Sequence, residues 1–133
     1  QEATLDVINL RLSSVRPDDT PGQLTGVRPL GQWALGSITV MLLADAVRAF
    51  TLAAEAPYQP RVRILNATAS RAWASAPTAD ILRHWWGNDV DLAYFEQPGN
   101  EYAAAYDVSA IERELGFAAT ATLQFLAQQG QGE

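Results

Sequence analysis

Cysteine and lysine are both absent from this chain of 133 residues, and histidine occurs once. Without cysteine, the chain forms no disulfide scaffold, no cysteine-ligated zinc site and no thiol nucleophile. Without lysine, it offers no amine for Schiff-base chemistry and none that would lower the pKa of a catalytic tyrosine. All nine basic residues are arginines, whose planar guanidinium groups suit contacts with carboxylates and phosphates.

Positive charge and long apolar runs are scarce as well. The chain carries 15 acidic and nine basic residues, for a net charge of −6, and it has no basic run. This balance argues against a nucleic-acid partner and gives no reason to expect binding to an anionic membrane surface. The longest apolar stretch, residues 33–44, is too short to span a bilayer and indicates buried core.

The beginning and the size of the chain set further expectations. No charged leader with an apolar stretch follows Gln1, so we expect a processed chain or a piece of a longer one, in a cytoplasmic location. The hydrophobic fraction of 48% and the charged fraction of 18% are typical of a globular protein. This length fits one domain over residues 1–133.

Hydrophobic patterning predicts strands that alternate with helices. Short runs rich in β-branched residues and leucine predict strands at residues 4–12, 38–43, 61–67 and 90–95. Capping signals predict helices at residues 45–56, 77–86, 108–115 and 121–128, the first of them capped by Asp45. Residues 13–31, rich in proline and glycine, predict a long loop. We therefore expect an α/β fold with a small, partly parallel sheet and flanking helices.

No segment carries a catalytic signature. The glycines do not form a phosphate-binding loop, and no nucleophile elbow is present. His84 follows Asp80 by four residues on one helix face, and its position beside Trp85 and Trp86 favours an interfacial helix residue over a catalytic one. None of the four tyrosines has a lysine four residues later. We therefore expect no catalytic residue, no cofactor-binding residue and no metal site in this chain.

Arg61 and Arg63 are candidate ligand-binding residues. Two positions apart on a predicted strand, they point to one face of the sheet. Side by side, two guanidinium groups form a clamp for a phosphate or a carboxylate. The alternative is a charged sheet edge that resists aggregation.

Four segments of the chain carry a family resemblance. LDVINLRLSSVRP (residues 5–17) is similar to a strand and loop in which Arg11 matches the family arginine. TVMLLADAVRAFTLAAEAP (39–57) holds an aspartate before a helix, matched by Asp45, and RVRILNATA (61–69) holds a strand that ends in asparagine. YDVSAIERELGF (106–117) matches the family's terminal Asp-x-Ser and Leu-Gly positions. In this order the segments resemble the C-terminal part of an NAD-dependent epimerase/dehydratase of the extended short-chain dehydrogenase/reductase family.

The resemblance implies that cofactor binding and substrate binding belong to different parts of the full-length enzyme. In that family an N-terminal glycine-rich segment binds NAD, and a Tyr-x-x-x-Lys pair performs the chemistry; residues 1–133 contain neither. The chain would therefore be the substrate-side half, which is not competent for catalysis alone, with NAD(P) bound only by a full-length relative. Ser13, Ser14 and Val15 would line a pocket for a sugar or sugar-nucleotide ligand. Such a chain would pair with a missing N-terminal half or form a homo-oligomer.

Two alternatives remain open at this point. A truncated gene would yield a stand-alone binding or assembly module, which would self-associate to cover an exposed strand at residues 5–12 or 61–67. An unrelated small α/β hydrolase-like enzyme is the other alternative, and no nucleophile motif supports it.

Overall fold

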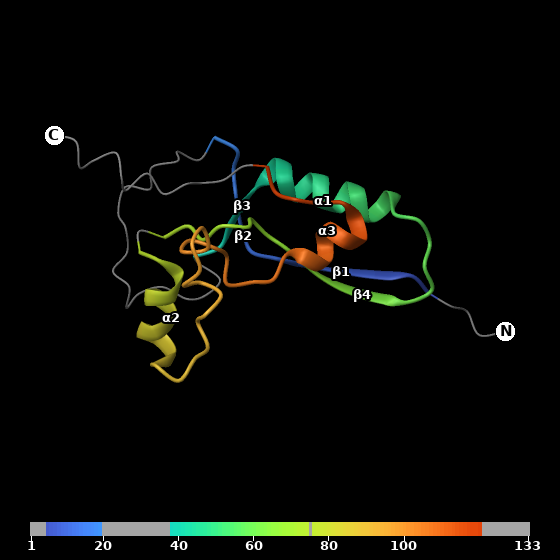
Figure 1. The fold of residues 1–133 in the computed structure, drawn as a ribbon. Coiled ribbons are helices and arrows are strands. Elements are labelled where there is room, and N and C mark those ends of the chain that lie inside the picture. Colours follow the sequence, from blue (N-terminus) through green and yellow to red (C-terminus); the bar gives the residue numbers. More distant parts are fainter. Residues whose placement is uncertain (1–4, 20–37, 75, 121–133) are drawn as a thin grey trace.

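The computed structural model describes residues 5–19, 38–74 and 76–120. Within them, four strands and three helices form a mixed α/β arrangement (Figure 1). The elements are β1 (Val7–Leu12), β2 (Ser14–Arg16), β3 (Val40–Leu42), α1 (Leu43–Glu55), β4 (Val62–Ala67), α2 (Thr78–Trp86) and α3 (Ser109–Leu115). No helix of these described ranges is long and apolar enough to cross a membrane. The α/β prediction is confirmed at this coarse level.

Two small parallel sheets carry the strands. β1 pairs with β4 in parallel, from Val7 opposite Val62 to Leu12 opposite Ala67. β2 pairs with β3, also in parallel. The expectation of one loop over residues 13–31 is therefore wrong at its start, because residues 14–16 form β2. Val15 packs against the core there, and this packing holds a strand too short to be recognised from periodicity.

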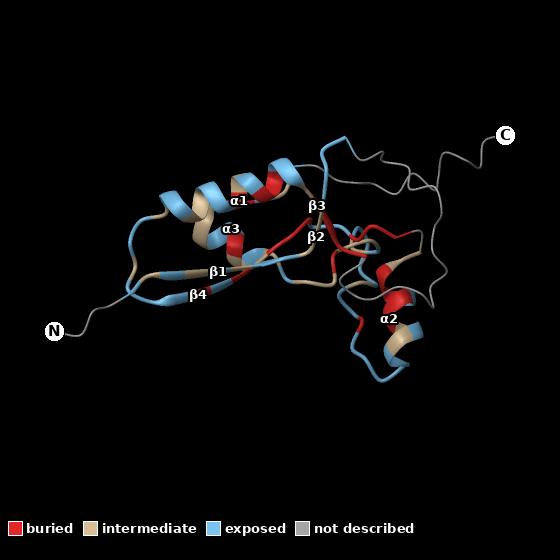
Figure 2. Ribbon diagram, turned by 180° about the vertical axis from the view of Figure 1, so that it is seen from behind, coloured by how far each residue is buried: buried red, intermediate tan, exposed pale blue. Residues whose placement is uncertain are grey.

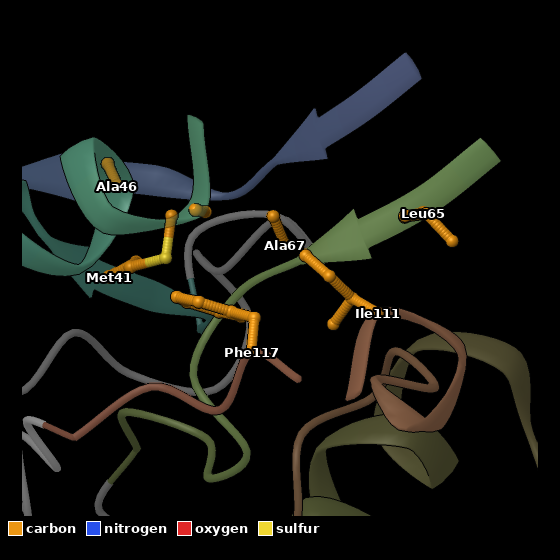
Figure 3. Close-up of a cluster of buried hydrophobic side chains, with 7 residues drawn as sticks. Met41, Ala46, Leu65, Ala67, Ile111 and Phe117 are labelled. Atoms are coloured by element: carbon orange, nitrogen blue, oxygen red, sulfur yellow. The ribbon is translucent and has the colours of Figure 1, made fainter. Parts of the chain in front are cut away.

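The main core lies between the β1–β4 sheet and the two helices α1 and α3. Its fully buried members come from β3, α1, β4, α3 and the segment after α3 (Figure 3): Met41, Ala46, Ala49, Leu65, Ala67, Ile111 and Phe117. Ile8 and Leu10 of β1 pack against them. α1 and α3 thus cover one face of this sheet, while α2 lies apart from it (Figure 1).

The other face of the β1–β4 sheet is uncovered by any described residue. Val7, Val62 and Ile64 are 41%, 64% and 52% exposed, and we call these three residues the open face. Figure 2 shows much of both strands in the colour of exposed residues. Arg63 and Leu65, which alternate with Val62 and Ile64 along β4, are buried. Parallel sheets are ordinarily covered on both faces, so an apolar open face is unusual.

The start of α1 differs from the sequence-based expectation. Asp45 is not the cap, because α1 begins at Leu43 and Asp45 lies within its first turn. The carboxylate of Asp18 instead accepts a hydrogen bond of 2.9 Å from the backbone N–H of Ala44. Asp45 is buried and accepts hydrogen bonds from Arg48 and from Thr120. A residue distant in sequence therefore caps the helix, which no local pattern reveals.

The ends of α2 and α3 agree with prediction, and the expected strand at residues 90–95 does not form. Both helices end at a glycine with positive φ, Gly87 at 78° and Gly116 at 66°. Residues 90–95 form turns, in which the carbonyl of Leu92 accepts from the N–H groups of Phe95 and Glu96. Leu92 is buried against Ala79 and Leu82 of α2. These residues are therefore held by packing against a helix and not by pairing with a strand. The predicted helix at 121–128 lies outside the described residues.

Candidate functional site

A polar cavity of about 350 Å³ lies where β1 and β4 end. Its walls come from the last residues of the two strands, the residues that follow them, and one tyrosine: Arg11, Leu12, Ser13, Ser14, Asn66, Thr68 and Tyr106. Arg11 and Asn66 are direct neighbours in the parallel register. In open α/β sheets, ligands bind beyond the carboxyl ends of the strands, and this cavity occupies that position.

Two hydrogen bonds fix the walls of the polar cavity. The Thr68 hydroxyl donates to Ser13 Oγ at 2.7 Å and thereby joins the segments that follow β1 and β4. Asn66 Nδ2 donates to the backbone oxygen of Asp107 at 3.0 Å, which ties the end of β4 to the residues before α3. Because Thr68 is 3% exposed, its side chain is held in place by its surroundings. The cavity is therefore built on fixed strand ends.

All six polar side chains in the lining of the polar cavity carry a hydrogen-bond donor. The Arg11 guanidinium has no hydrogen-bond or ion-pair partner among the described residues, and it offers five N–H donors. Ser13, Ser14 and Thr68 contribute hydroxyl groups to the same lining, and Tyr106 adds a phenolic hydroxyl. No carboxylate is among the described residues of the lining. This arrangement suits an anionic or hydroxyl-rich small molecule.

The structure places the five predicted binding residues in three locations. Ser13 and Ser14 line the polar cavity, as the family resemblance implies. Val15 points elsewhere, since it packs against the main core. Arg61 and Arg63 lie at the amino end of β4, opposite the end that carries the cavity. These two arginines therefore do not join Ser13 and Ser14 in one site.

Arg61 and Arg63 already hold carboxylates of this chain. Arg63, whose side chain is 1% exposed, donates to Asp6 at 2.9 Å, and its other terminal nitrogen lies 3.7 Å from Glu114. Arg61, with a side chain 51% exposed, donates to both oxygens of Glu114, at 2.9 and 2.7 Å. We call these four residues the ion cluster; it ties the amino end of β4 to α3 and to the segment before β1.

The pKa of both carboxyl groups in the ion cluster is lowered. The backbone N–H of Gln59 and then the Arg63 guanidinium hold the pKa of Asp6 below its ordinary value of 3.8. The hydrogen bond from Arg61 has the largest effect on Glu114 and holds its pKa below 4.5. Both groups therefore stay ionised at neutral pH, and the two arginines remain neutralised.

Sequence reasoning missed Leu12 and four polar residues in the lining of the polar cavity. Arg11, Asn66, Thr68 and Tyr106 were not assigned to it, although the first three lie at the ends of strands that were predicted. The rule that ligands bind at the carboxyl ends of parallel strands would have indicated them once β1 and β4 were taken as neighbours. No signal in the sequence brings Tyr106 there, because it lies about forty residues after β4.

The remaining candidates form no second chemical centre. His84 is exposed on α2, and its neighbour on that face, Asp80, pairs with Arg83 at 3.4 Å. Across the described ranges, no group of three or more metal-binding side chains comes together.

Comparisons with known proteins give no assignment. No protein-family model matches the chain, and neither the search of curated proteins nor the search of solved structures found a match.

Proposed function

We propose that this chain is the substrate-side part of an NAD(P)-dependent sugar or sugar-nucleotide epimerase/dehydratase-like protein. Its fold would correspond to the C-terminal half of an extended Rossmann-type enzyme. The polar cavity would bind the sugar-type ligand, with Ser13 and Ser14 donating to its hydroxyl groups and Arg11 supplying the positive charge. The chain would not catalyse the reaction alone.

One observation carries this proposal. Ser13 and Ser14, which the resemblance assigns to substrate binding, line a donor-rich cavity at the carboxyl ends of two adjacent parallel strands. Those strands, β1 and β4, come from two of the four segments that carry the resemblance. The position and the chemistry of the cavity therefore agree with a substrate site.

The dinucleotide would be bound by a different part of the assembly. The sequence holds no glycine-rich loop for a pyrophosphate and no lysine for the Tyr-x-x-x-Lys pair. NAD(P), when bound by the complementary half, would supply the hydride acceptor. The residues of this chain would hold and orient the ligand beside it, and we expect no dinucleotide binding by the isolated chain.

A second candidate function rests on the open face. An apolar, uncovered side of a parallel sheet favours association with another layer, whether an N-terminal half or a second copy of the chain. A stand-alone assembly module derived from the same family would use this surface. The two functions differ in whether the polar cavity binds a ligand.

Titration of the ¹⁵N-labelled chain with D-glucuronate tests the proposal by NMR. We expect shifts confined to the backbone amides of Ser13, Ser14, Asn66 and Thr68, with a millimolar dissociation constant, on the order of −4 kcal/mol. NAD⁺ at the same concentration should leave the spectrum unchanged. Absence of shifts with glucuronate, or shifts produced by NAD⁺, would contradict the proposal. Ser14→Ala should weaken glucuronate binding, whereas Ser70→Ala, outside the polar cavity, should not.

A further inference from the structure

A second cavity of about 560 Å³ shares one lining residue, Tyr106, with the polar cavity. The lining residues that matter for its chemistry are aromatic and aliphatic: Tyr94, Phe95, Ala103, Ala104, Ala105 and Val108. We call it the apolar cavity. It lies between the turns that follow α2 and the segment that leads into α3, and no prediction from the sequence placed a site there.

Tyr106 is a wall of both cavities. The hydrogen bond from Asn66 to the backbone of Asp107 holds this segment against the end of β4. In the lining of the apolar cavity, Tyr94 and Phe95 stack edge to face, with ring centroids 5.3 Å apart. The two cavities therefore have one aromatic wall residue in common, and the residue after it is tied to the sheet.

The two cavities differ in charge as well as in polarity. The polar cavity carries the Arg11 guanidinium, which pairs with no described residue, and no carboxylate of a described residue lines it. The apolar cavity has two carboxylates in its lining, Asp107 and Glu112. Hydrogen bonds from Ser109 hold the pKa of Asp107 below its ordinary value, so this group is ionised at neutral pH. An anion is favoured in the first space and repelled from the second.

We propose that the two cavities together bind one bipartite ligand, a sugar acid or sugar phosphate that carries an aromatic ring. The anionic, hydroxyl-rich end lies beside Arg11, and the ring lies in the apolar cavity against Tyr94 and Phe95. The difference in charge between the two cavities determines the orientation in which the ligand binds. Burial of a planar ring among aromatic and aliphatic side chains supplies affinity that the polar cavity alone lacks. This inference rests on the proposed function of the polar cavity and adds the class of its ligand.

The test compares 4-nitrophenyl β-D-glucuronide with D-glucuronate, using calorimetry and NMR on the 133-residue chain. We expect the aryl glucuronide to bind at least about tenfold more tightly. It should shift the amides of Ala103 and Ala105 in addition to those of the polar cavity, whereas glucuronate should shift the polar cavity alone. Equal affinity of the two probes, or no additional shifts, would overturn the bipartite ligand and leave the proposed function intact. Binding of neither probe would overturn both.

Two variants separate the ends of the ligand. Tyr94→Ala should reduce the affinity for the aryl glucuronide toward that for glucuronate and leave glucuronate unaffected, because Tyr94 lines only the apolar cavity. Arg11→Gln should weaken both probes by about tenfold or more. Tyr58→Ala and Arg71→Gln are matched controls outside both linings and should change neither affinity. Equal weakening of both probes by Tyr94→Ala would contradict the inference.

Discussion

Thr68 Oγ1 lies 2.7 Å from Ser13 Oγ and donates a hydrogen bond to it, although the two residues are 55 positions apart in the chain. This bond closes the polar cavity between the ends of β1 and β4. Because Thr68 is buried, the protein around it leaves little freedom for either hydroxyl. The Ser13 oxygen accepts this hydrogen bond, so its own hydroxyl proton is left to donate to a ligand.

Replacement of Thr68 by valine tests the structural value of this bond. The change keeps the shape of the side chain and removes the donor, so we expect a loss of about 1 kcal/mol in the free energy of unfolding. Chemical denaturation measures it. Thr51→Val serves as the control, because that exposed hydroxyl bonds only within α1, to the carbonyl of Val47. An equal effect of both substitutions would refute a special role for Thr68.

The two arginines of the ion cluster should differ sharply in their contribution to stability. Arg63→Ala removes a side chain that is 1% exposed and leaves Asp6 without its guanidinium partner, which we expect to cost about 3 kcal/mol. Arg61→Ala removes a half-exposed side chain and should cost less than about 1 kcal/mol. Denaturant midpoints of the two variants give the comparison. A similar cost for both would show that burial does not govern the cluster.

The ion cluster should also make stability depend on acid. Asp6 and Glu114 have pKa values in the folded chain below 3.8 and 4.5, so the unfolded chain binds more protons in this range. Their stabilising contribution is present above those ordinary values and is lost as the pH falls through the lower, folded-state values. Melting temperatures recorded from pH 7 to pH 3 should fall at the acid end. The fall should be shallower in Asp6→Asn, but not in the control Asp89→Asn, an exposed residue outside the cluster.

The cap of α1 gives a fourth prediction. Asp18→Ala removes the acceptor for the Ala44 N–H and should cost about 1 kcal/mol in the free energy of unfolding. Asp19→Ala, one position further, removes the same charge from a side chain with no hydrogen bond to a described residue, and it should be near neutral. Thermal melts of the two variants decide the matter; equal losses would indicate a general charge effect in place of a cap.

Association through the open face is the fifth prediction. We expect the chain to self-associate as its concentration rises, because Val62 and Ile64 present uncovered apolar surface. Ile64→Lys should reduce this association in light-scattering measurements. Leu43→Lys, a substitution at a comparably exposed apolar residue of α1, is the control and should leave it intact. A chain that stays monomeric at high concentration would argue against the assembly function.

Local signals explain which parts of the fold were predictable. The β-branched runs of β1 and β4, and the glycines that end α2 and α3, act through neighbours in the sequence, and the structure confirms them. The prediction of a strand at residues 90–95 is wrong because Leu92 packs against α2, a contact that the hydrophobic periodicity of the sequence does not reveal. β2 was not predicted from the sequence for a similar reason, since its three residues depend on pairing with β3.

The candidate site was predictable only in part. Ser13 and Ser14 were assigned through the resemblance and lie in the polar cavity. Arg61 and Arg63 were assigned from their spacing, but spacing contains no information on the carboxylates of Asp6 and Glu114 that neutralise them. Tyr106 enters both cavities through the path of the chain between α2 and α3, which follows from tertiary packing alone.

The parallel register of β1 and β4 has a consequence for the order of folding. Each residue of β1 meets a partner 55 positions later, so the chain must close a long loop before the sheet gains any hydrogen bond. The backbone hydrogen bonds within helix α1 join near neighbours in the sequence, so this helix can begin to form earlier. The polar cavity exists only after that closure, and ligand binding there therefore reports that β1 and β4 have paired.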